Sequence, residues 1–205
     1  MRKVINCIGI VFLFLSLASC KKNMKAGEYV SYVSKNDNGL RKNTVVDGFE
    51  FCMQYRPYDY IILMESKGNF KSYDLEKRSS ELKGTAWFSI TIKRSDNNST
   101  PLRYGITSIE EYNQRLNYYL NEAKKDIWLV YDNETIHPAS YLFENNYNLT
   151  PQETIMVGFF LPAGEDYPKK NMQLSYNDQV FKSGIIKATY SEDALRNIPN
   201  LVYKN

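Results

Sequence analysis

The segment Trp87-Phe88-Ser89-Ile90-Thr91-Ile92-Lys93 alternates apolar and polar side chains along most of its length. A period of two is typical of a β-strand with one buried face. β-Branched and aromatic residues also fit a pleated, half-buried surface well. We therefore expect a strand that buries Phe88, Ile90 and Ile92. Trp87 falls on the opposite face of the same strand.

Working outward from this strand, other short segments show apolar or alternating patterns separated by turn residues. Before it, Phe49–Tyr55 alternates and is followed by Pro57, which ends a strand or places it at an edge. Glu28–Val33 alternates weakly and suggests a first strand. Asn177-Asp178 suggests a hairpin turn between two further strands. The strands expected after Asp126 are Ile127–Tyr131, Ser140–Phe143, Ile155–Leu161, Met172–Tyr176, Gln179–Lys182 and Ile185–Tyr190.

Helical spacing appears at fewer places. Ser108-Ile109-Glu110-Glu111 has the form of a capping box and predicts an amphipathic helix over Ile109–Ala123. Tyr73–Lys83 suggests a shorter helix with Gly84 as its cap. Ser191 is placed to cap a short helical turn before Pro199. For Tyr60–Met64 the pattern does not separate a strand from a helix.

Many short strands separated by turn residues are typical of a sandwich or barrel. We predict a mostly-β fold, α+β by content, of the immunoglobulin-like β-sandwich type, with the one clear amphipathic helix inserted. Residues 28–205 are expected to form a single domain, because no Pro-, Gly- or Ser-rich boundary is present. A division near Asp126 is the alternative.

The first twenty residues carry an export pattern. Arg2 and Lys3 precede the apolar run Val4–Ser16, which is too short for the roughly 20 residues of a spanning helix. Leu17-Ala18-Ser19-Cys20 follows and resembles the lipobox of bacterial lipoproteins. The resemblance implies that residues 1–19 are a cleaved signal peptide, that the Cys20 thiol is lipidated and that the new amino group is acylated.

The residues after Cys20 suggest where such a lipoprotein would lie. Residues 20–27 are expected to be the lipidated cysteine and a polar tether spanning at most roughly 28 Å. An Asp directly after the cysteine would resemble an inner-membrane retention signal, but Lys21 stands there. This resemblance implies the outer membrane, with the domain facing the periplasm. The cell surface is the alternative, although no acidic cluster lies beside the anchor.

Composition limits the possible partners. The whole chain has 26 basic and 23 acidic side chains, and loss of Arg2 and Lys3 with the signal leaves 24 and 23. A net charge of +1 gives no reason to expect nucleic-acid binding. Cys52 is the one thiol left after removal of Cys7 and lipidation of Cys20, so no disulfide framework is expected. The 17 tyrosines fit either an aromatic binding surface or simple strand preference, and we favour the latter.

The sequence offers little for catalysis. His137 is the only histidine, and no Gly-x-Ser-x-Gly elbow is present. Ser80-Glu81-Leu82-Lys83, Ser95-Asp96-Asn97 and Lys182-Ser183-Gly184 resemble the motifs of penicillin-binding proteins, but Gly84 ends the first helix too early for that fold. Metal sites built on His or Cys clusters are excluded by count. We therefore expect no enzyme, no metal and no cofactor.

Two binding functions remain. The first expectation is a non-enzymatic docking or assembly protein, held to the membrane through Cys20 and contacting a protein partner in the envelope. The alternative is a glycan- or ligand-binding lipoprotein that uses exposed aromatic rings. Trp87 and Trp128 are the candidate ligand-binding residues, because each lies opposite the more apolar face of its strand. Hydrolysis is the least favoured class.

Overall fold

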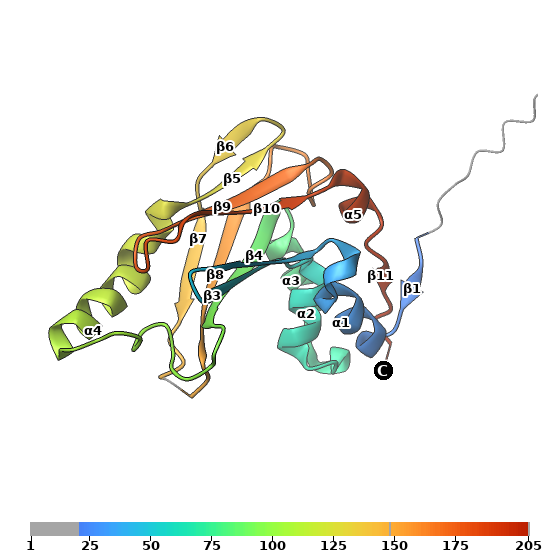
Figure 1. Ribbon diagram of the computed structural model, residues 1–205. Coiled ribbons are helices and arrows are strands. Elements are labelled where there is room, and N and C mark those ends of the chain that lie inside the picture. Colours follow the sequence, from blue (N-terminus) through green and yellow to red (C-terminus); the bar gives the residue numbers. More distant parts are fainter. Residues whose placement is uncertain (1–20, 148, 205) are drawn as a thin grey trace, which may run out of the picture.

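The computed structural model describes residues 21–147 and 149–204, and the predicted signal peptide and lipidation site at Cys20 lie outside these residues. Its main feature is a pair of antiparallel sheets, one above the other in Figure 1. The first sheet has the order β2 (Arg41–Val46), β3 (Phe49–Tyr55), β4 (Thr85–Arg94), β8 (Gln152–Phe160) and β7 (Ser140–Glu144). The second has the order β10 (Gly184–Tyr190), β9 (Met172–Asp178), β5 (Ile127–Tyr131) and β6 (Glu134–Ile136). A short parallel pair joins β1 (Asn23–Met24) to β11 (Asn200–Leu201).

The strand that the alternation of residues 87–93 predicts is β4, at the centre of the first sheet. Ile90 pairs with Met53 on one side and with Ile155 on the other, and all three side chains are buried. The inner faces of the two sheets meet through aromatic rings: the Phe88 ring centroid lies 5.4 Å from that of Tyr190. The mostly-β prediction is confirmed, and the sheets face each other as layers of a sandwich.

The core draws on both halves of the chain. β8 follows Asp126 in sequence but pairs along its length with β4, which precedes Asp126. One cluster of buried side chains includes residues of both sheets and of the N-terminal helices. Several tyrosines belong to it: Tyr29, Tyr119, Tyr131, Tyr176 and Tyr190 are among the largest fully buried side chains. Much of the tyrosine content therefore serves packing.

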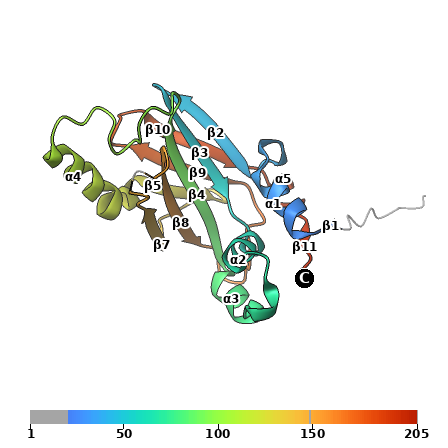
Figure 2. The same ribbon diagram turned by 90° about the horizontal axis from the view of Figure 1, so that it is seen from below.

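Helices gather at two places around the sandwich. At one end lie α1 (Ala26–Ser34), α2 (Tyr58–Ser66) and α3 (Leu75–Leu82), and α4 (Ile109–Asn117) lies on the other side of the sheets (Figure 2). The short α5 (Glu192–Arg196) follows β10. The segment Tyr60–Met64 thus belongs to a helix, with Ile62 fully buried. No helix within residues 21–147 and 149–204 has the length and apolar character needed to cross a membrane.

The structure corrects the predicted N-terminal region. Glu28–Val33 is helical, because Tyr29 and Val33 lie four residues apart and are buried together on one face of α1. The predicted tether of residues 20–27 is also wrong for most of its length. Asn23 and Met24 pair with β11, and Lys25 is the N-cap of α1. Only Lys21 and Lys22 separate this folded segment from Cys20.

The predicted hairpin around Asn177-Asp178 is wrong as well. Both residues belong to β9, and Gln179–Lys182 forms the connecting loop instead of a strand. The Asp178 carboxylate organises this loop by accepting hydrogen bonds from the backbone N–H groups of Val180, Phe181 and Ser183. An aspartate that binds the backbone ahead of it favours a loop over a strand.

The helix predicted after Ser108 is confirmed, but it is shorter than predicted. The Ser108 hydroxyl oxygen accepts from the Glu111 N–H as the capping pattern requires. α4 ends at Asn117, and a π-helical turn (Tyr118–Glu122) and a 3-10 turn (Ala123–Asp126) follow. The predicted apolar stripe is buried only at Tyr119 and Ala123, whereas Ile109 is 63% exposed and Leu120 46% exposed.

One buried acid on the inner face of the first sheet should make stability depend on pH. Glu153 is only 1% exposed, and burial raises the pKa of its carboxyl from 4.5 to about 7, with the Thr100 hydroxyl and the Leu102 N–H partly offsetting this. The folded state therefore binds this proton more tightly than the unfolded chain. Its contribution is fully present below about pH 4.5 and is lost as pH rises through about 7.

We expect Glu153→Gln to remove this loss and to raise the free energy of unfolding at pH 8 by about 1–3 kcal/mol. Near pH 4.5 the variant and the wild type should differ little. Urea unfolding at both pH values measures the effect. Glu144→Gln is the matched control, because Glu144 is exposed on β7. Equal stability of Glu153→Gln and wild type at both pH values would contradict the assignment.

Candidate functional site

The outer face of the second sheet carries the candidate site. Along β5, Ile127, Leu129 and Tyr131 point into the core, so Trp128 and Val130 point outward and are half-buried. In register across the sheet, Trp128 lies beside Ser175 and Val130 lies beside Gln173. Helices α1 to α4 lie below or beside this sheet in Figure 1, and none of them covers its upper face.

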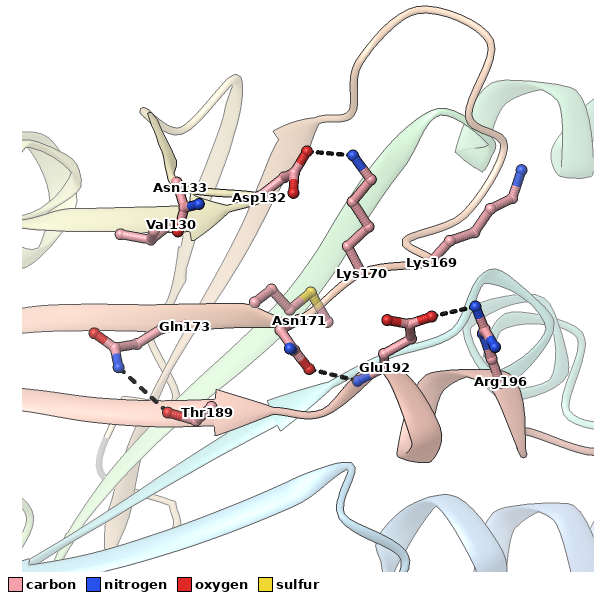
Figure 3. Close-up of a pocket in the computed structure, with 11 residues that line it drawn as sticks. Val130, Asp132, Asn133, Lys169, Lys170, Asn171, Gln173, Thr189, Glu192 and Arg196 are labelled. Carbon is pink, nitrogen blue, oxygen red and sulfur yellow. Dashed lines mark hydrogen bonds and ion pairs between the residues drawn. The ribbon is translucent and has the colours of Figure 1, made fainter.

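A polar hollow of about 570 Å³ lies at one end of this face (Figure 3). Three parts of the fold converge there: the β5–β6 turn, the outward residues of β9 and β10 with the segment before β9, and helix α5. We call this hollow the polar groove. Its lining residues are Val130, Asp132, Asn133, Lys169, Lys170, Asn171, Met172, Gln173, Thr189, Glu192 and Arg196.

The turn between β5 and β6 places two polar side chains at the rim of the groove. Tyr131 pairs with Glu134, so Asp132 and Asn133 form a two-residue hairpin loop. Their φ angles are 51° and 67°. Positive φ at both central residues is the geometry of the type I′ turn, which Asn and Asp tolerate better than most residues. The local backbone therefore explains why these two residues stand at this position.

Neighbouring side chains hold the polar groups of the groove in place. Lys170 pairs with Asp132 and Arg196 pairs with Glu192, as the close-up in Figure 3 shows. The Asp132 carboxylate raises the pKa of Lys170. Each acid in the lining thus has a cationic partner, and Lys169 adds a further positive charge. These exposed pairs contribute little to stability, but they limit the positions that the groups adopt.

Neutral hydrogen-bonding groups complete the lining. The Gln173 amide donates to the Thr189 hydroxyl over 3.3 Å, and Asn171 Oδ1 accepts from the Glu192 N–H over 2.8 Å. Gln173 and Thr189 belong to adjacent strands and share a register position. Amides and hydroxyls both donate and accept, so the groove can match a ligand that does the same.

The arrangement offers no catalytic constellation among the described residues. His137 is exposed just after β6 and does not line the groove. Within residues 21–147 and 149–204, no group of three or more His, Cys, Asp or Glu side chains could hold a metal ion. The two acids of the groove are engaged with Lys170 and Arg196. Binding is the chemistry that these side chains support best.

The structure places the two candidate tryptophans, Trp87 and Trp128, on different sheets. Trp128 lies on the same sheet face as the polar groove, two residues before Val130 on β5. Trp87 lies on the outer face of the first sheet, on the other side of the sandwich. Its indole N–H donates to the Leu82 carbonyl over 3.2 Å, and a Cβ added at Gly158 would lie 2.8 Å from its ring. Trp87 is therefore packed against its neighbours.

Sequence reasoning missed the polar residues of the groove. The alternation within β5 and within the C-terminal strands showed which side chains point outward. It could not show that the segment before β9, the β5–β6 turn and α5 meet at one place. The helix cap at Ser191, confirmed by its hydrogen bond from the Ala194 N–H, was the one local signal close to Glu192 and Arg196.

Comparison with protein-family models, with curated proteins and with solved structures finds no match to this chain.

Proposed function

We propose that this protein is a lipid-anchored, non-enzymatic binding protein of the bacterial envelope, and that the outer face of its second sheet binds a glycan. One observation carries the proposal: Trp128 and the polar groove lie along the same uncovered sheet face. A sugar presents an apolar C–H face beside hydroxyls that donate and accept hydrogen bonds. The indole ring suits the first, and the amide and hydroxyl groups of Gln173, Thr189 and Asn133 suit the second.

The size and preorganisation of the groove favour this ligand class. A volume of about 570 Å³ falls within the range of small-molecule sites and leaves room for a short saccharide. The ion pairs Lys170–Asp132 and Arg196–Glu192 hold planar groups at the rim before a ligand arrives. Fixed polar groups lose less conformational freedom on binding, which supports affinity.

A protein partner, which was the first expectation from the sequence, is the second candidate here. The specific observation in its favour is strand β10, which pairs only with β9 among the described strands and exposes 52% of Ile185. An unpaired edge can accept a strand from another chain. The edge at β7 supports docking less, because the Tyr141 hydroxyl donates to the Tyr119 carbonyl and the Tyr119 ring stacks on Phe143 at 5.1 Å.

The membrane attachment and location are part of the proposal. Support comes from the lipobox-like residues 17–20, with Cys20 as the lipidated residue, and from Lys21 in place of a retention signal. We infer an outer-membrane anchor with the domain facing the periplasm, the cell surface being the alternative. The fixed N-terminal segment adds that the domain would lie close to the bilayer.

The immunoglobulin-like class is also proposed, on the basis of strand order. β3-β4-β8-β7 follows the A-B-E-D order of that fold, and β10-β9-β5-β6 follows G-F-C-C′. Helix α4 would then be an insertion between the second and third strands of the pattern, and β2 an addition at the edge. The inter-sheet disulfide of antibody domains has no counterpart in the described residues, where Cys52 is free and buried.

The glycan proposal predicts that Trp128→Ala lowers glycan affinity by about 10-fold, which corresponds to ~1.4 kcal/mol. Stacking on the indole would be lost, while the groove would stay intact. The measurement is a glycan array with the full-length protein in detergent, followed by calorimetry with the best ligand. Gln173→Ala should weaken the same ligand, because it removes a hydrogen-bonding group from the groove.

Phe160→Ala is the matched control, since Phe160 is 68% exposed on the outer face of the first sheet. It should leave glycan binding unchanged. If no glycan is retained, or if Trp128→Ala binds as well as wild type, glycan binding on this face is wrong. The β10 edge would then become the leading candidate.

A further inference from the structure

A second cavity, of about 160 Å³, lies where the N-terminal segment meets the domain. Four stretches far apart in sequence converge on it: the N-terminal segment with α1, the chain from the end of β3 to the start of α2, the loop before β9, and the chain from α5 to β11. We call it the tyrosine pocket. Its lining residues are Lys21, Tyr29, Tyr55, Pro57, Tyr58, Asp59, Tyr167, Pro168, Leu195, Ile198, Pro199 and Asn200.

Tyrosine rings form much of the wall. Tyr55 is only 3% exposed, Tyr58 is half-buried, and Tyr167 is 43% exposed. Tyr29 is fully buried, and its hydroxyl has no hydrogen-bond partner within the described residues. A buried hydroxyl left without a partner costs about 1–3 kcal/mol, so such a group calls for an explanation. A ligand that donates a hydrogen bond into the pocket would provide one.

Asp59 supplies negative charge at the same place. Its carboxylate accepts a hydrogen bond from the Tyr203 hydroxyl over 2.5 Å. Within residues 21–147 and 149–204, Asp59 forms no ion pair. Burial raises the pKa of Asp59, and the Tyr203 hydrogen bond and the charge of Lys21 partly counter this. Burial and the Asp59 charge together raise the pKa of Tyr58 to about 12. The tyrosines beside this carboxylate therefore stay neutral.

The rim of the pocket already attracts cations. The Lys21 Nζ lies 5.5 Å from the centroid of the Tyr167 ring, and the Lys169 Nζ lies 5.4 Å from it. These distances are typical of cation–π contacts. Lys21 does not fill the pocket, because the volume of about 160 Å³ remains with its side chain in place. The two lysines at the rim show that this site favours cations, and the interior of the pocket has room for a further group.

We propose that the tyrosine pocket binds a small organic ammonium group, with Asp59 as counter-charge and the aromatic rings as a cage. Aromatic rings around a cation are the established means of binding choline-like groups. The Tyr29 hydroxyl oxygen would accept a hydrogen bond from a primary ammonium. The volume suits one headgroup-sized ligand and excludes a longer polymer.

Two sources can supply this chemistry: a free amine, or the ethanolamine headgroup of a phospholipid. The N-terminal geometry favours the lipid. β1 is fixed against β11, and Lys21, the residue after Cys20, lies at the pocket. This choice of source rests on the proposed lipid anchor at Cys20, whereas the pocket chemistry does not.

The test is a titration of the full-length protein, in nonionic detergent and with ¹³C-labelled tyrosine rings, with ethanolamine and with tetramethylammonium. We expect both to shift ring signals of the pocket. Asp59→Asn should lower the affinity for both probes by about 10-fold or more. Lys21→Gln should raise the affinity for both probes, because it removes a competing cation. Asp47→Asn, at the exposed β2–β3 turn, has the same charge change and should bind as wild type.

Tyr167→Ala provides a second variant if Asp59→Asn fails to fold, since Tyr167 is partly exposed. It should lower the affinity for tetramethylammonium. Tyr147→Ala should not, because Tyr147 is 77% exposed and does not line the pocket. Tighter binding of dihexanoyl phosphatidylethanolamine than of ethanolamine would identify the lipid headgroup. Equal or weaker binding would identify a free amine. No shift with any ammonium probe, or an unchanged shift in both pocket variants, would overturn the proposal without affecting glycan binding or the anchor at Cys20.

Discussion

Asp178→Ala should lower the free energy of unfolding by about 3 kcal/mol or more, among the larger effects expected of a single side chain in this domain. Asp178 is 2% exposed at the end of β9. Its carboxylate accepts from the Val180, Phe181 and Ser183 N–H groups over distances of 3.1 to 3.3 Å. Alanine would leave these donors without their charged acceptor.

The loss would extend beyond the loop. The Phe181 ring stacks on Phe49 of the first sheet with centroids 3.8 Å apart, and the Arg115 guanidinium lies 5.1 Å from the Phe181 centroid. Asp178 therefore holds a contact that joins the loop after β9 in the second sheet to strand β3 of the first sheet. Once the loop is free, this aromatic contact should weaken together with the backbone hydrogen bonds.

Urea unfolding followed by circular dichroism measures the effect. The free energy of unfolding of Asp178→Asn should lie between those of Asp178→Ala and the wild type. One side-chain oxygen still accepts a hydrogen bond, while the amide NH₂ faces the remaining donors. Asp37→Ala, at an exposed site, is the control and should change stability by less than about 0.5 kcal/mol. A loss below ~1 kcal/mol in Asp178→Ala would show that water replaces the carboxylate without cost.

The central strands could be predicted from the sequence because one face of each is buried. In β4, Phe88, Ile90 and Ile92 are all fully buried, as the alternation requires. β2 was not predicted, because it lacks such a buried face. At the edge of the sheet it buries no side chain completely, and its sequence Arg41–Val46 shows no apolar period. A strand held mainly by backbone pairing with β3 leaves little pattern in its side chains.

The helix α1 and the sites show a different limit. Tyr29 and Val33 fit both a weak alternation and an i, i+4 pair, and the contact with the rest of the core selects the helix. The sequence marked Trp128 as an outward aromatic residue, but the polar groove needs three distant segments to meet. The tyrosine pocket needs four distant segments to meet. Spacing along a chain contains no information on such meetings unless a known family supplies it.

Cys20→Ala should abolish lipid labelling and release the protein from the membrane fraction, if the proposed anchor is right. Burying acyl chains contributes about 0.8 kcal/mol per methylene, and a single chain holds a protein only marginally. The lipobox resemblance implies three chains, so attachment through Cys20 would be effectively permanent. The described residues offer no spanning helix as a substitute.

Cys52→Ala is the matched control, because Cys52 is a buried thiol, 6% exposed, in β3. It should be labelled and retained as wild type is. The measurements are metabolic labelling with a palmitate analogue and fractionation of the cells. Normal labelling and retention of Cys20→Ala would show that the resemblance at residues 17–20 is misleading.

Protease treatment of intact and lysed cells then tests the proposed location, with the domain on the periplasmic side of the outer membrane. We expect the wild-type protein to survive in intact cells and to be cleaved after lysis, since Lys21, Lys22 and Lys25 form no acidic export signal. With β1 fixed against β11, only two residues separate the folded segment from Cys20, the proposed lipidation site. The domain would therefore lie against the bilayer on either side. Cleavage in intact cells would place it on the surface, where the groove beside Trp128 would meet external glycans.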